Sequence, residues 1–363
     1  MLGNTMKRNH NPSSDSLAQT SGTAEVVDAL ISNVLENIRL QGAVFFAWQP
    51  SWPFATGVPS ECHFRDLILP SSDQVISYHI VVEGPCWATV EGEKPVRLEG
   101  GDILLVPHGD AYAISDQPRG PSDQDIEPAQ QFFAMMAAGE LPLVIQDGGG
   151  GPGQSQLVCG FLGCDRHPWN PLLEGLPRFI VLSRSALHGP INDLIDIVLR
   201  ECGHPGAGSR SMMRRLGELL FIEVIRQFLQ HQGLANNPWM RGLADPLVGK
   251  SLSLLHGRIA ETWTLEKLAS EVNCSRSVLA ERFSRVIGVP PMKYLSQWRL
   301  QVAARLLRGR QDKILSIALS VGYESETSFS RAFKRSLGTS PSAFRRSVTS
   351  DGGHLAENIN FNE

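Results

Sequence analysis

The 363-residue sequence contains no long hydrophobic run, and this absence excludes a protein that crosses a membrane with a helix. Such a helix needs about 18 or more consecutive apolar residues, and the chain has no stretch of that kind. Its first 23 residues are rich in Asn, Ser and Thr and lack the apolar core of a signal peptide. We therefore expect a cytoplasmic protein without a membrane partner.

Cysteine is scarce, and six residues without a secretory signal do not form a disulfide framework. Cys159 and Cys164 are separated by four residues and followed by His167, which leaves open a zinc site or a redox pair. Such a zinc site needs further ligands, which only residues 62–63 and Cys86 supply. Because free cysteine is among the most buried residue types, we favour buried thiols. Cys86, Cys159 and Cys164 remain candidate redox residues, and no metal ligand is assigned.

The sequence also lacks the common catalytic motifs. It has no Gly-x-Ser-x-Gly, no phosphate-binding loop of the Walker type, no His-Glu-x-x-His and no dinucleotide-binding fingerprint. The glycine run at 148–153 is not placed between a strand and a helix, as a phosphate-binding loop would be. We therefore expect no enzyme, no catalytic residue and no cofactor.

A repeated segment near the C-terminus organises the chain. Residues 275–285 and 325–335 match at an offset of 50, which keeps a serine, a phenylalanine and a final arginine in register. The match continues through the pairs Gly288/Gly338 and Pro291/Pro341. A repeat at such a period usually marks a repeated supersecondary unit.

Each copy has the pattern of a helix-turn-helix unit. Thr264, Ser275 and Ser325 are suitable N-caps, and apolar residues recur at helical spacing behind each of them. A long helical pattern over 291–307 lies between the copies. This helix would fix the distance between two recognition helices, which could then enter successive major-groove segments about one helical turn apart.

The charges are divided unevenly between the two parts of the chain. Residues 245–346 hold 17 Lys and Arg against 8 Asp and Glu, a net charge of +9, whereas the whole chain carries −4. The remainder therefore carries −13. A basic module joined to an acidic one favours nucleic acid as the partner of the basic module.

Residues 245–346 resemble the DNA-binding domain of AraC/XylS-type transcription regulators. The most specific part is Ile317-Ala318-x-x-Val321-Gly322-Tyr323-x-Ser325, continued by Phe329-Ser330-Arg331-Ala332-Phe333-Lys334 and by Gly338-x-Ser340-Pro341. The resemblance implies a regulator, with activation favoured over repression, that binds double-stranded promoter DNA and works with RNA polymerase. The expected DNA-binding residues are Arg276, Ser277, Glu281, Arg282, Arg285, Glu326, Thr327, Ser330, Arg331, Lys334 and Arg335. For Arg282, Arg285, Lys334 and Arg335 the alternative is a solvated helix face or an ion pair within the chain.

The N-terminal half contains several short apolar segments separated by turns, which is typical of an antiparallel sandwich or barrel. The strands are expected at 43–48, 64–69, 77–82, 86–90 and 103–106. Residues 101–112 resemble a cupin motif, except that Tyr112 stands where metal-binding cupins have a histidine, and His79 has no second histidine beside it. We therefore expect a metal-free pocket for a small organic or oxidant effector, lined by His79, Trp87 and Tyr112.

The predicted fold is a multidomain α+β chain. It comprises a disordered tail (1–24), a cupin-like antiparallel β-barrel (25–188) with a flexible insert near 116–156, a helical connector (189–244), an all-α DNA-binding domain with two helix-turn-helix units (245–346) and a second disordered tail (347–363). The connector helices at 191–201 and 209–231 either form a homodimer interface or pack within their own domain. The alternative function is a cupin protein, metal-free or metal-binding, whose helical domain serves only for interaction.

Overall fold

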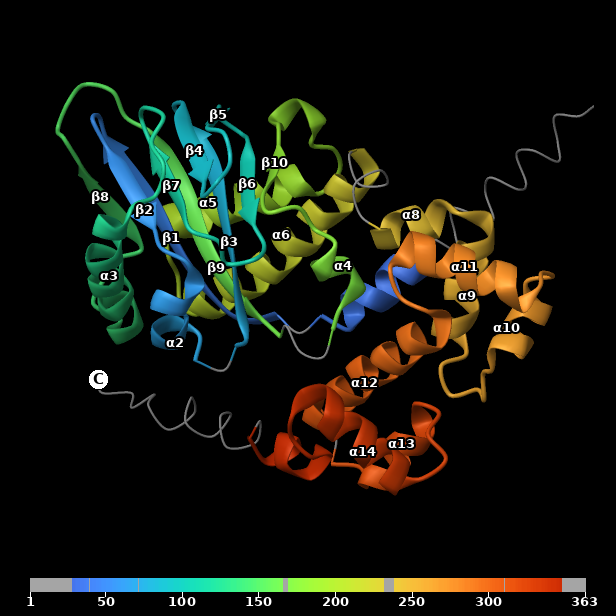
Figure 1. Cartoon of the computed structure of the whole chain (residues 1–363). Coiled ribbons are helices and arrows are strands. Elements are labelled where there is room, and N and C mark those ends of the chain that lie inside the picture. The colour runs from blue at the N-terminus through green and yellow to red at the C-terminus, as the bar shows by residue number, and fades with distance from the viewer. Residues whose placement is uncertain are drawn as a thin grey trace, which may run out of the picture.

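The computed structural model describes residues 28–38, 40–70, 72–165, 169–231, 238–309 and 311–347. Figure 1 shows a β-rich N-terminal part and a helical C-terminal part joined by packed helices. The predicted tail at 1–24, most of the tail at 347–363 and the candidate ligand His167 lie outside the described residues. None of the described helices has both the length and the apolar character needed to cross a bilayer.

The described strands of the N-terminal part form two sheets. The six-stranded sheet has the order β10-β6-β3-β9-β1-β8, and the four-stranded sheet has the order β2-β7-β4-β5. The strands are β1 (Leu40–Ser51), β2 (Ala55–Val58), β3 (Gln74–Glu83), β4 (Cys86–Val90), β5 (Val96–Leu98), β6 (Ile103–Val106), β7 (Tyr112–Ser115), β8 (Val144–Gly148), β9 (Gln156–Cys164) and β10 (Ile180–Leu182). The predicted strands at 43–48, 77–82, 86–90 and 103–106 lie within β1, β3, β4 and β6, which confirms them.

The two sheets form a sandwich and not the closed barrel predicted. Within the described residues each sheet keeps its own two edges, β10 and β8 in one and β2 and β5 in the other. The sheets are also not wholly antiparallel, because β1 pairs in parallel with β8. Alternate side chains of β3 and β9 point between the sheets, where they join a core that contains Val75, Val81, Cys159 and Phe161.

Two predictions in this part are wrong. Residues 64–69 are not a strand, because Arg65–Ile68 forms helix α2. Their order, Phe-Arg-Asp-Leu-Ile-Leu, places two charged residues together and so breaks the alternation a strand needs. The segment 116–156 is not a flexible insert, because it contains helix α3 (Ile126–Ala138) and strand β8. Phe133 of α3 stacks on Phe64, with ring centroids 4.2 Å apart, so the two helices stabilise each other.

The outer face of the six-stranded sheet is covered by helices (Figure 1). α5 (Ile191–Gly203) and α6 (Ser209–His231) pack against each other, and α6 packs on β1. The short helix α4 (Pro171–Glu174) contacts the C-terminal part, and a helix over residues 28–36 also packs into this core. The three 3-10 turns are η1 (Glu61–His63), η2 (Asp123–Asp125) and η3 (Arg184–Ala186).

The C-terminal part is helical. Its helices are α8 (Pro238–Ala244), α9 (Pro246–Gly257), α10 (Leu265–Glu271), α11 (Arg276–Ile287), α12 (Pro291–Gly309), α13 (Ile314–Ser320) and α14 (Glu326–Leu337), and residues 341–347 are also helical. The helices α10, α11, α12, α13 and α14 confirm two helix-turn-helix units joined by a long helix (Figure 1).

The hydrophobic cores divide the molecule differently from the domains. One core extends from the outer face of the six-stranded sheet through α5 and α6 into the first helix-turn-helix unit, as far as Trp298. A separate core fills the second unit and begins at Leu300. Since α12 contributes its first half to one core and its second half to the other, this helix is the principal connection between the two units.

Candidate DNA-binding surface and effector pocket

The two helix-turn-helix units are built by the same local rules. Thr264, Ser275 and Ser325 are the N-caps of α10, α11 and α14, and each side-chain hydroxyl accepts a hydrogen bond from a backbone N–H of the first turn. Gly288 and Gly338 end α11 and α14 with a left-handed backbone, φ 87° and 75°. The expected caps and stops are therefore confirmed in both copies.

The two turns have the same geometry at their start but different lengths. Asn273 follows α10 with φ 57°, and Gly322 follows α13 with φ 86°. The next residue then donates its N–H to a buried alanine carbonyl in each unit, Cys274 to Ala269 and Tyr323 to Ala318. These equivalent pairs are 49 residues apart, whereas the recognition helices are 50 apart, so the second turn is one residue longer.

The predicted DNA-binding residues all belong to the two recognition helices. Ser330 is partly buried, and the others are exposed: Arg276, Ser277, Glu281, Arg282 and Arg285 on α11, with Glu326, Thr327, Arg331, Lys334 and Arg335 on α14. The apolar faces point inward, since Leu279, Phe283, Phe329 and Phe333 are buried. An exposed polar face opposite a buried stripe is the arrangement that a recognition helix requires.

The arginines of α11 are engaged within the protein. Arg276 pairs with Glu266 at 2.5 Å, Arg282 pairs with Asp245 at 2.8 Å, and Arg285 pairs with Glu281. Burial alone would raise the pKa of Asp245, but hydrogen bonds from Arg282 and from the first turn of α9 lower it. In the protein without DNA, Arg282 and Arg285 are therefore paired within the chain.

The positively charged residues of α14, unlike those of α11, are not paired with carboxylates of the described chain. Within the part of the chain that the structure describes, Arg331, Lys334 and Arg335 form no ion pair. Lys334 and Arg335 also lie in the last turn of the helix. Charge that is not neutralised within the protein is available to phosphate, so the second unit presents the stronger electrostatic surface for DNA.

Arg299 of α12 ties the two units together. Its guanidinium donates to the carbonyls of Ile259 at 3.0 Å and Glu261 at 2.6 Å, both in the loop before α10. The same group lies 6.0 Å from the ring centroid of Tyr323, in the turn of the second unit. This contact fixes one unit against the other across α12.

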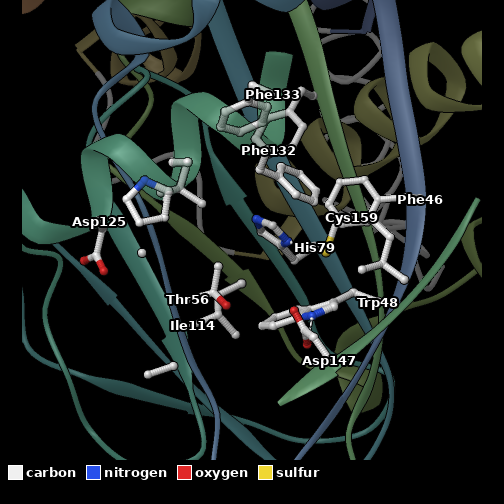
Figure 2. Close-up of a pocket in the computed structure, with 17 residues that line it drawn as sticks. Phe46, Trp48, Thr56, His79, Ile114, Asp125, Phe132, Phe133, Asp147 and Cys159 are labelled. Carbon is white, nitrogen blue, oxygen red and sulfur yellow. Dashed lines mark hydrogen bonds between the residues drawn. The ribbon is translucent and has the colours of Figure 1, made fainter. Parts of the chain in front are cut away.

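A cavity in the N-terminal part lies between the sheets and α3. Its volume is about 330 Å³, and aromatic side chains from β1, β9 and α3 form much of its wall: Phe46, Trp48, Phe132, Phe133 and Phe161. Figure 2 shows Phe132 and Phe133 on one side, with His79 and Cys159 at the centre. An apolar cavity with a few polar groups is the usual form of a small-molecule site.

His79 lies at the base of this cavity in a closed set of contacts. Its Nε2 is 2.7 Å from the Tyr112 hydroxyl, and its Nδ1 is 3.0 Å from the Cys159 sulfur. Burial lowers the pKa of His79 to about 3, so the imidazole is neutral at pH 7. Both ring nitrogens are thus occupied by neutral partners. No group of three or more His, Cys, Asp or Glu side chains gathers as metal ligands in the described residues.

Comparison with known proteins decides the family. A family described as Cupin matches residues 29–230, and one described as Helix-turn-helix domain matches residues 268–347. An AraC-like transcription regulator of Streptomyces antibioticus is 32% identical over 285 residues, which cover 78% of this chain and 90% of that protein. The chain belongs to the AraC family of transcription regulators.

The chain is also similar to a second curated regulator and, over a short part, to a solved structure. The HTH-type transcriptional regulator MtrA of Neisseria gonorrhoeae is 29% identical over 272 residues, covering 74% of this chain and 85% of that protein. The crystal structure of an AraC-type regulator from Chromobacterium violaceum is 28% identical in sequence. The matched region spans 28% of this chain and 92% of the crystallised chain, with a TM-score of 0.27. Both of these curated relatives are named as transcription regulators. As an AraC-type protein with this domain, the chain binds double-stranded DNA.

The structure of this AraC-type regulator corrects two expectations about the effector residues and agrees with the favoured interpretation of Cys86, Cys159 and Cys164 as buried thiols. Trp87 does not line the cavity, because on β4 Cys86 points into the core between the sheets and Trp87 is on the other side. Cys159 and Cys164 do not form a pair, since an odd separation along β9 places them in the cores on opposite faces of the sheet. Tyr112 does not line the cavity directly but contacts His79, which does.

Two of the candidate redox thiols, Cys86 and Cys159, lie in surroundings that raise the pKa. Burial, together with the nearby carboxylates of Asp102 and Glu99, raises the pKa of Cys86 to about 12. Burial also raises the pKa of Cys159. Since the thiolate is the reactive form, these environments disfavour oxidation.

Two groups in the cavity were missed by sequence reasoning, namely the α3 aromatics and the pair Trp48 and Asp147. The Trp48 indole donates to the Asp147 carboxylate at 2.7 Å, across the parallel pairing of β1 and β8. A signal for α3 was present, because Ser122 and Asp125 form a capping box ahead of apolar residues at helical spacing. No local signal pairs residue 48 with residue 147.

Proposed function

We propose that this regulator activates transcription in response to a small organic effector that binds the cavity between the sheets and α3. The observation that carries the proposal is the continuous core on the back of the same sheet. His79 of the cavity and Tyr78 of that core are neighbours on β3 and point to opposite faces. A ligand that shifts β3 or β1 therefore also moves the side chains on the opposite face of the sheet. Those side chains belong to the core that extends into the first helix-turn-helix unit.

The contacts between the two parts support this route. Gln301 of α12 donates to the carbonyl of Asn37 at 2.9 Å, and Arg308 at the end of α12 pairs with Asp165 at the end of β9. The His256 imidazole lies 3.2 Å from the Asn33 side chain. The helix over residues 28–36 and the end of β9 thus both contact the DNA-binding part, so a change in the sandwich alters how that part is held.

On the DNA, α14 supplies phosphate contacts through Lys334 and Arg335, and base or phosphate contacts through Thr327, Ser330 and Arg331. On α11, Arg276, Ser277 and Glu281 face the second groove segment, and its arginines exchange their ion pairs for phosphate on binding. RNA polymerase is the further partner that activation requires. We expect α5 and α6 to be the site of any homodimer, since Met212 and Leu219 of α6 are exposed apolar residues.

The test uses a cavity-filling variant. Ala129 lies on α3, is buried and lines the cavity, so Ala129→Phe fills the space that an effector would occupy. Operator DNA is first obtained by selection from random sequence with the purified wild-type protein. A reporter behind that operator is then measured with both proteins.

We expect Ala129→Phe to bind the operator with wild-type affinity in a gel shift. We also expect that its reporter output no longer changes when cell extract is added or the growth condition is altered. Ala134→Phe, the same substitution at an exposed position of α3 outside the cavity lining, serves as the matched variant and retains a response. Full wild-type regulation by Ala129→Phe would rule out the cavity as the sensing site.

A further inference from the structure

The cavity carries charge of one sign. Its lining includes two carboxylates, Asp125 and Asp147, and no lysine or arginine. The remaining titratable groups are His79, a neutral imidazole at pH 7, and the buried thiol of Cys159. Nothing in the wall therefore supplies positive charge to a bound anion.

Asp125 is already used by the protein. Its Oδ1 accepts from Arg119 at 2.8 Å, and its Oδ2 accepts from the backbone N–H of Ser122 at 2.9 Å. Its side chain is also packed against Gly57, where even a Cβ atom would clash with the carboxylate. This carboxylate is a structural cap, and its charge is offset by Arg119.

Asp147 is in a different position. Its Oδ1 accepts from the Trp48 indole at 2.7 Å, which orients the carboxylate beside a ring that lines the cavity. It lies on the edge strand β8, is exposed, and forms no ion pair with any Lys, Arg or His of the described chain. Figure 2 shows Asp147 next to Trp48, across the cavity from the α3 aromatics. One carboxylate without a counter-charge therefore stands beside an aromatic wall.

We propose that the effector is an apolar organic cation, an alkyl or aryl ammonium whose apolar body lies among the rings and whose charged nitrogen lies at Asp147 and the Trp48 ring. This inference rests on the proposed function and names the ligand class. An ammonium group gains from a carboxylate and from the negative face of an indole together. A carboxylate ligand of the same shape would meet Asp147 with no partner for its own charge, and a neutral one would cover an unpaired carboxylate.

Three probes of one shape test the ligand class: 3-phenylpropylammonium, 3-phenylpropanol and 3-phenylpropanoate, each titrated into the full-length protein by calorimetry at pH 7. The ammonium should bind at least about tenfold more tightly than the alcohol, and the carboxylate should bind most weakly. Equal binding of the ammonium and the alcohol, stronger binding of the carboxylate, or no binding of the ammonium would overturn the proposal.

Two variants locate the effect. Asp147→Asn keeps an oxygen that accepts from Trp48 but removes the charge, so the ammonium and the alcohol should bind within about threefold of each other. Glu93→Gln removes one exposed carboxylate in the turn between β4 and β5, outside the cavity, and should leave the preference unchanged. If Asp147→Asn still binds the ammonium more tightly than it binds the alcohol, Asp147 is not the group that recognises the positive charge.

The outcomes also separate this inference from the proposed function. If the alcohol or the carboxylate binds wild type but not Ala129→Phe, and the ammonium has no advantage, the cavity is a ligand site of another class. If Ala129→Phe regulates the reporter as wild type does, the cavity is not the sensing site, whatever it binds.

Discussion

At the residue scale, the contacts of His79 determine whether its imidazole can bond to a ligand in the cavity. Each nitrogen of His79 is in contact with Tyr112 or Cys159, so neither is directed at an incoming ligand. The ring therefore contributes to the shape and polarity of the cavity wall, and the proposed recognition of an effector rests on the aromatic side chains and Asp147.

The thiols give a direct test of the redox hypothesis. Cys62 is exposed, whereas Cys86, Cys159 and Cys164 are buried. On treatment of the folded protein with iodoacetamide at pH 7.5, we expect Cys62 to be alkylated first and the three buried thiols only on unfolding. Burial keeps the reagent away from all three, and it also raises the pKa of Cys86 and Cys159, so that little of their reactive thiolate forms. Peptide mass spectrometry over time measures the order. If Cys159 were modified early and DNA binding were lost at the same time, the result would favour the hypothesis that the protein senses an oxidant.

Arg331 tests base reading by α14. It is exposed and without an ion pair in the described chain, so Arg331→Ala should lower the discrimination between operator and altered operators by about 1–3 kcal/mol if it contacts guanine. Circular dichroism and Tm should be unchanged, since the side chain is outside the core. Competitive gel shifts against single-base operator variants measure the loss at one position. Uniform weakening at every position would instead assign Arg331 to phosphate.

At the scale of elements, the two recognition helices differ in how their cations are held. Lys334→Gln on α14 should reduce the slope of log affinity against log salt by about 0.9, because one phosphate contact is lost. Arg285→Gln on α11 should change the slope less, because Arg285 already pairs with Glu281 in the free protein. Titrations from 50 to 300 mM salt on operator and random DNA measure both slopes. The reverse order would show that the α11 arginines carry the phosphate contacts.

The turn before α14 depends on glycine. At Gly322 the backbone has φ +86°, and a Cβ would lie 2.8 Å from the carbonyl oxygen of Ile259 and 2.4 Å from the Arg299 guanidinium. Gly322→Ala should therefore cost about 1–3 kcal/mol of stability and weaken DNA binding, since it disturbs the tie between the units. Gly309→Ala is the control, because a Cβ there meets nothing within 4 Å and its φ is not left-handed. Thermal denaturation should show a lower Tm for the first variant only.

The sequence predicts the elements whose signals are local. The helix-turn-helix units follow from caps and apolar spacing, and the strand at 86–90 matches β4 at both ends. The strand expected at 64–69 is an error against a local signal, because the adjacent charges of Arg65 and Asp66 already break the alternation of a strand. The Trp48–Asp147 contact has no local signal, because it depends on a parallel pairing across about one hundred residues. The charged faces of α11 and α14 look alike in sequence, and only the folded chain shows that Asp245 and Glu266 neutralise one of them.

At the scale of the whole molecule, a buried polar network joins the two parts. The Trp239 indole donates to the Tyr294 hydroxyl at 2.8 Å, and that hydroxyl is 2.8 Å from His256 Nε2. The other nitrogen of His256 contacts Asn33, on the helix over residues 28–36. This network connects the first helix of the N-terminal part to α8, α9 and α12.

The network predicts sensitivity to acid. Burial lowers the pKa of both His79 and His256 to about 3, below the ordinary value near 6.5, so between these values the unfolded chain binds protons that the folded chain does not. The stabilising contribution of each neutral histidine is thus fully present above about pH 6.5. Below that pH the free energy of unfolding falls by about 1.4 kcal/mol per pH unit for each histidine. Urea unfolding at pH 7 and pH 5 measures the fall.

Two variants identify the source of the acid effect. His256→Gln should be less stable than wild type at pH 7 but should lose about 2 kcal/mol less between pH 7 and pH 5. His204→Gln, at an exposed position, should follow wild type. An unchanged fall in His256→Gln would mean that other groups govern acid unfolding.

The unequal helix-turn-helix units give a bound molecule a direction. One turn is a residue longer than the other, and one recognition helix has its arginines paired while the other does not. A single chain therefore meets a DNA site whose two halves differ, and it has no symmetry that would let it bind equally well when turned end for end. The orientation of the site then determines on which side of it the N-terminal sandwich lies. Inverting an operator at constant distance from a promoter should consequently change the output of that promoter while leaving occupancy the same.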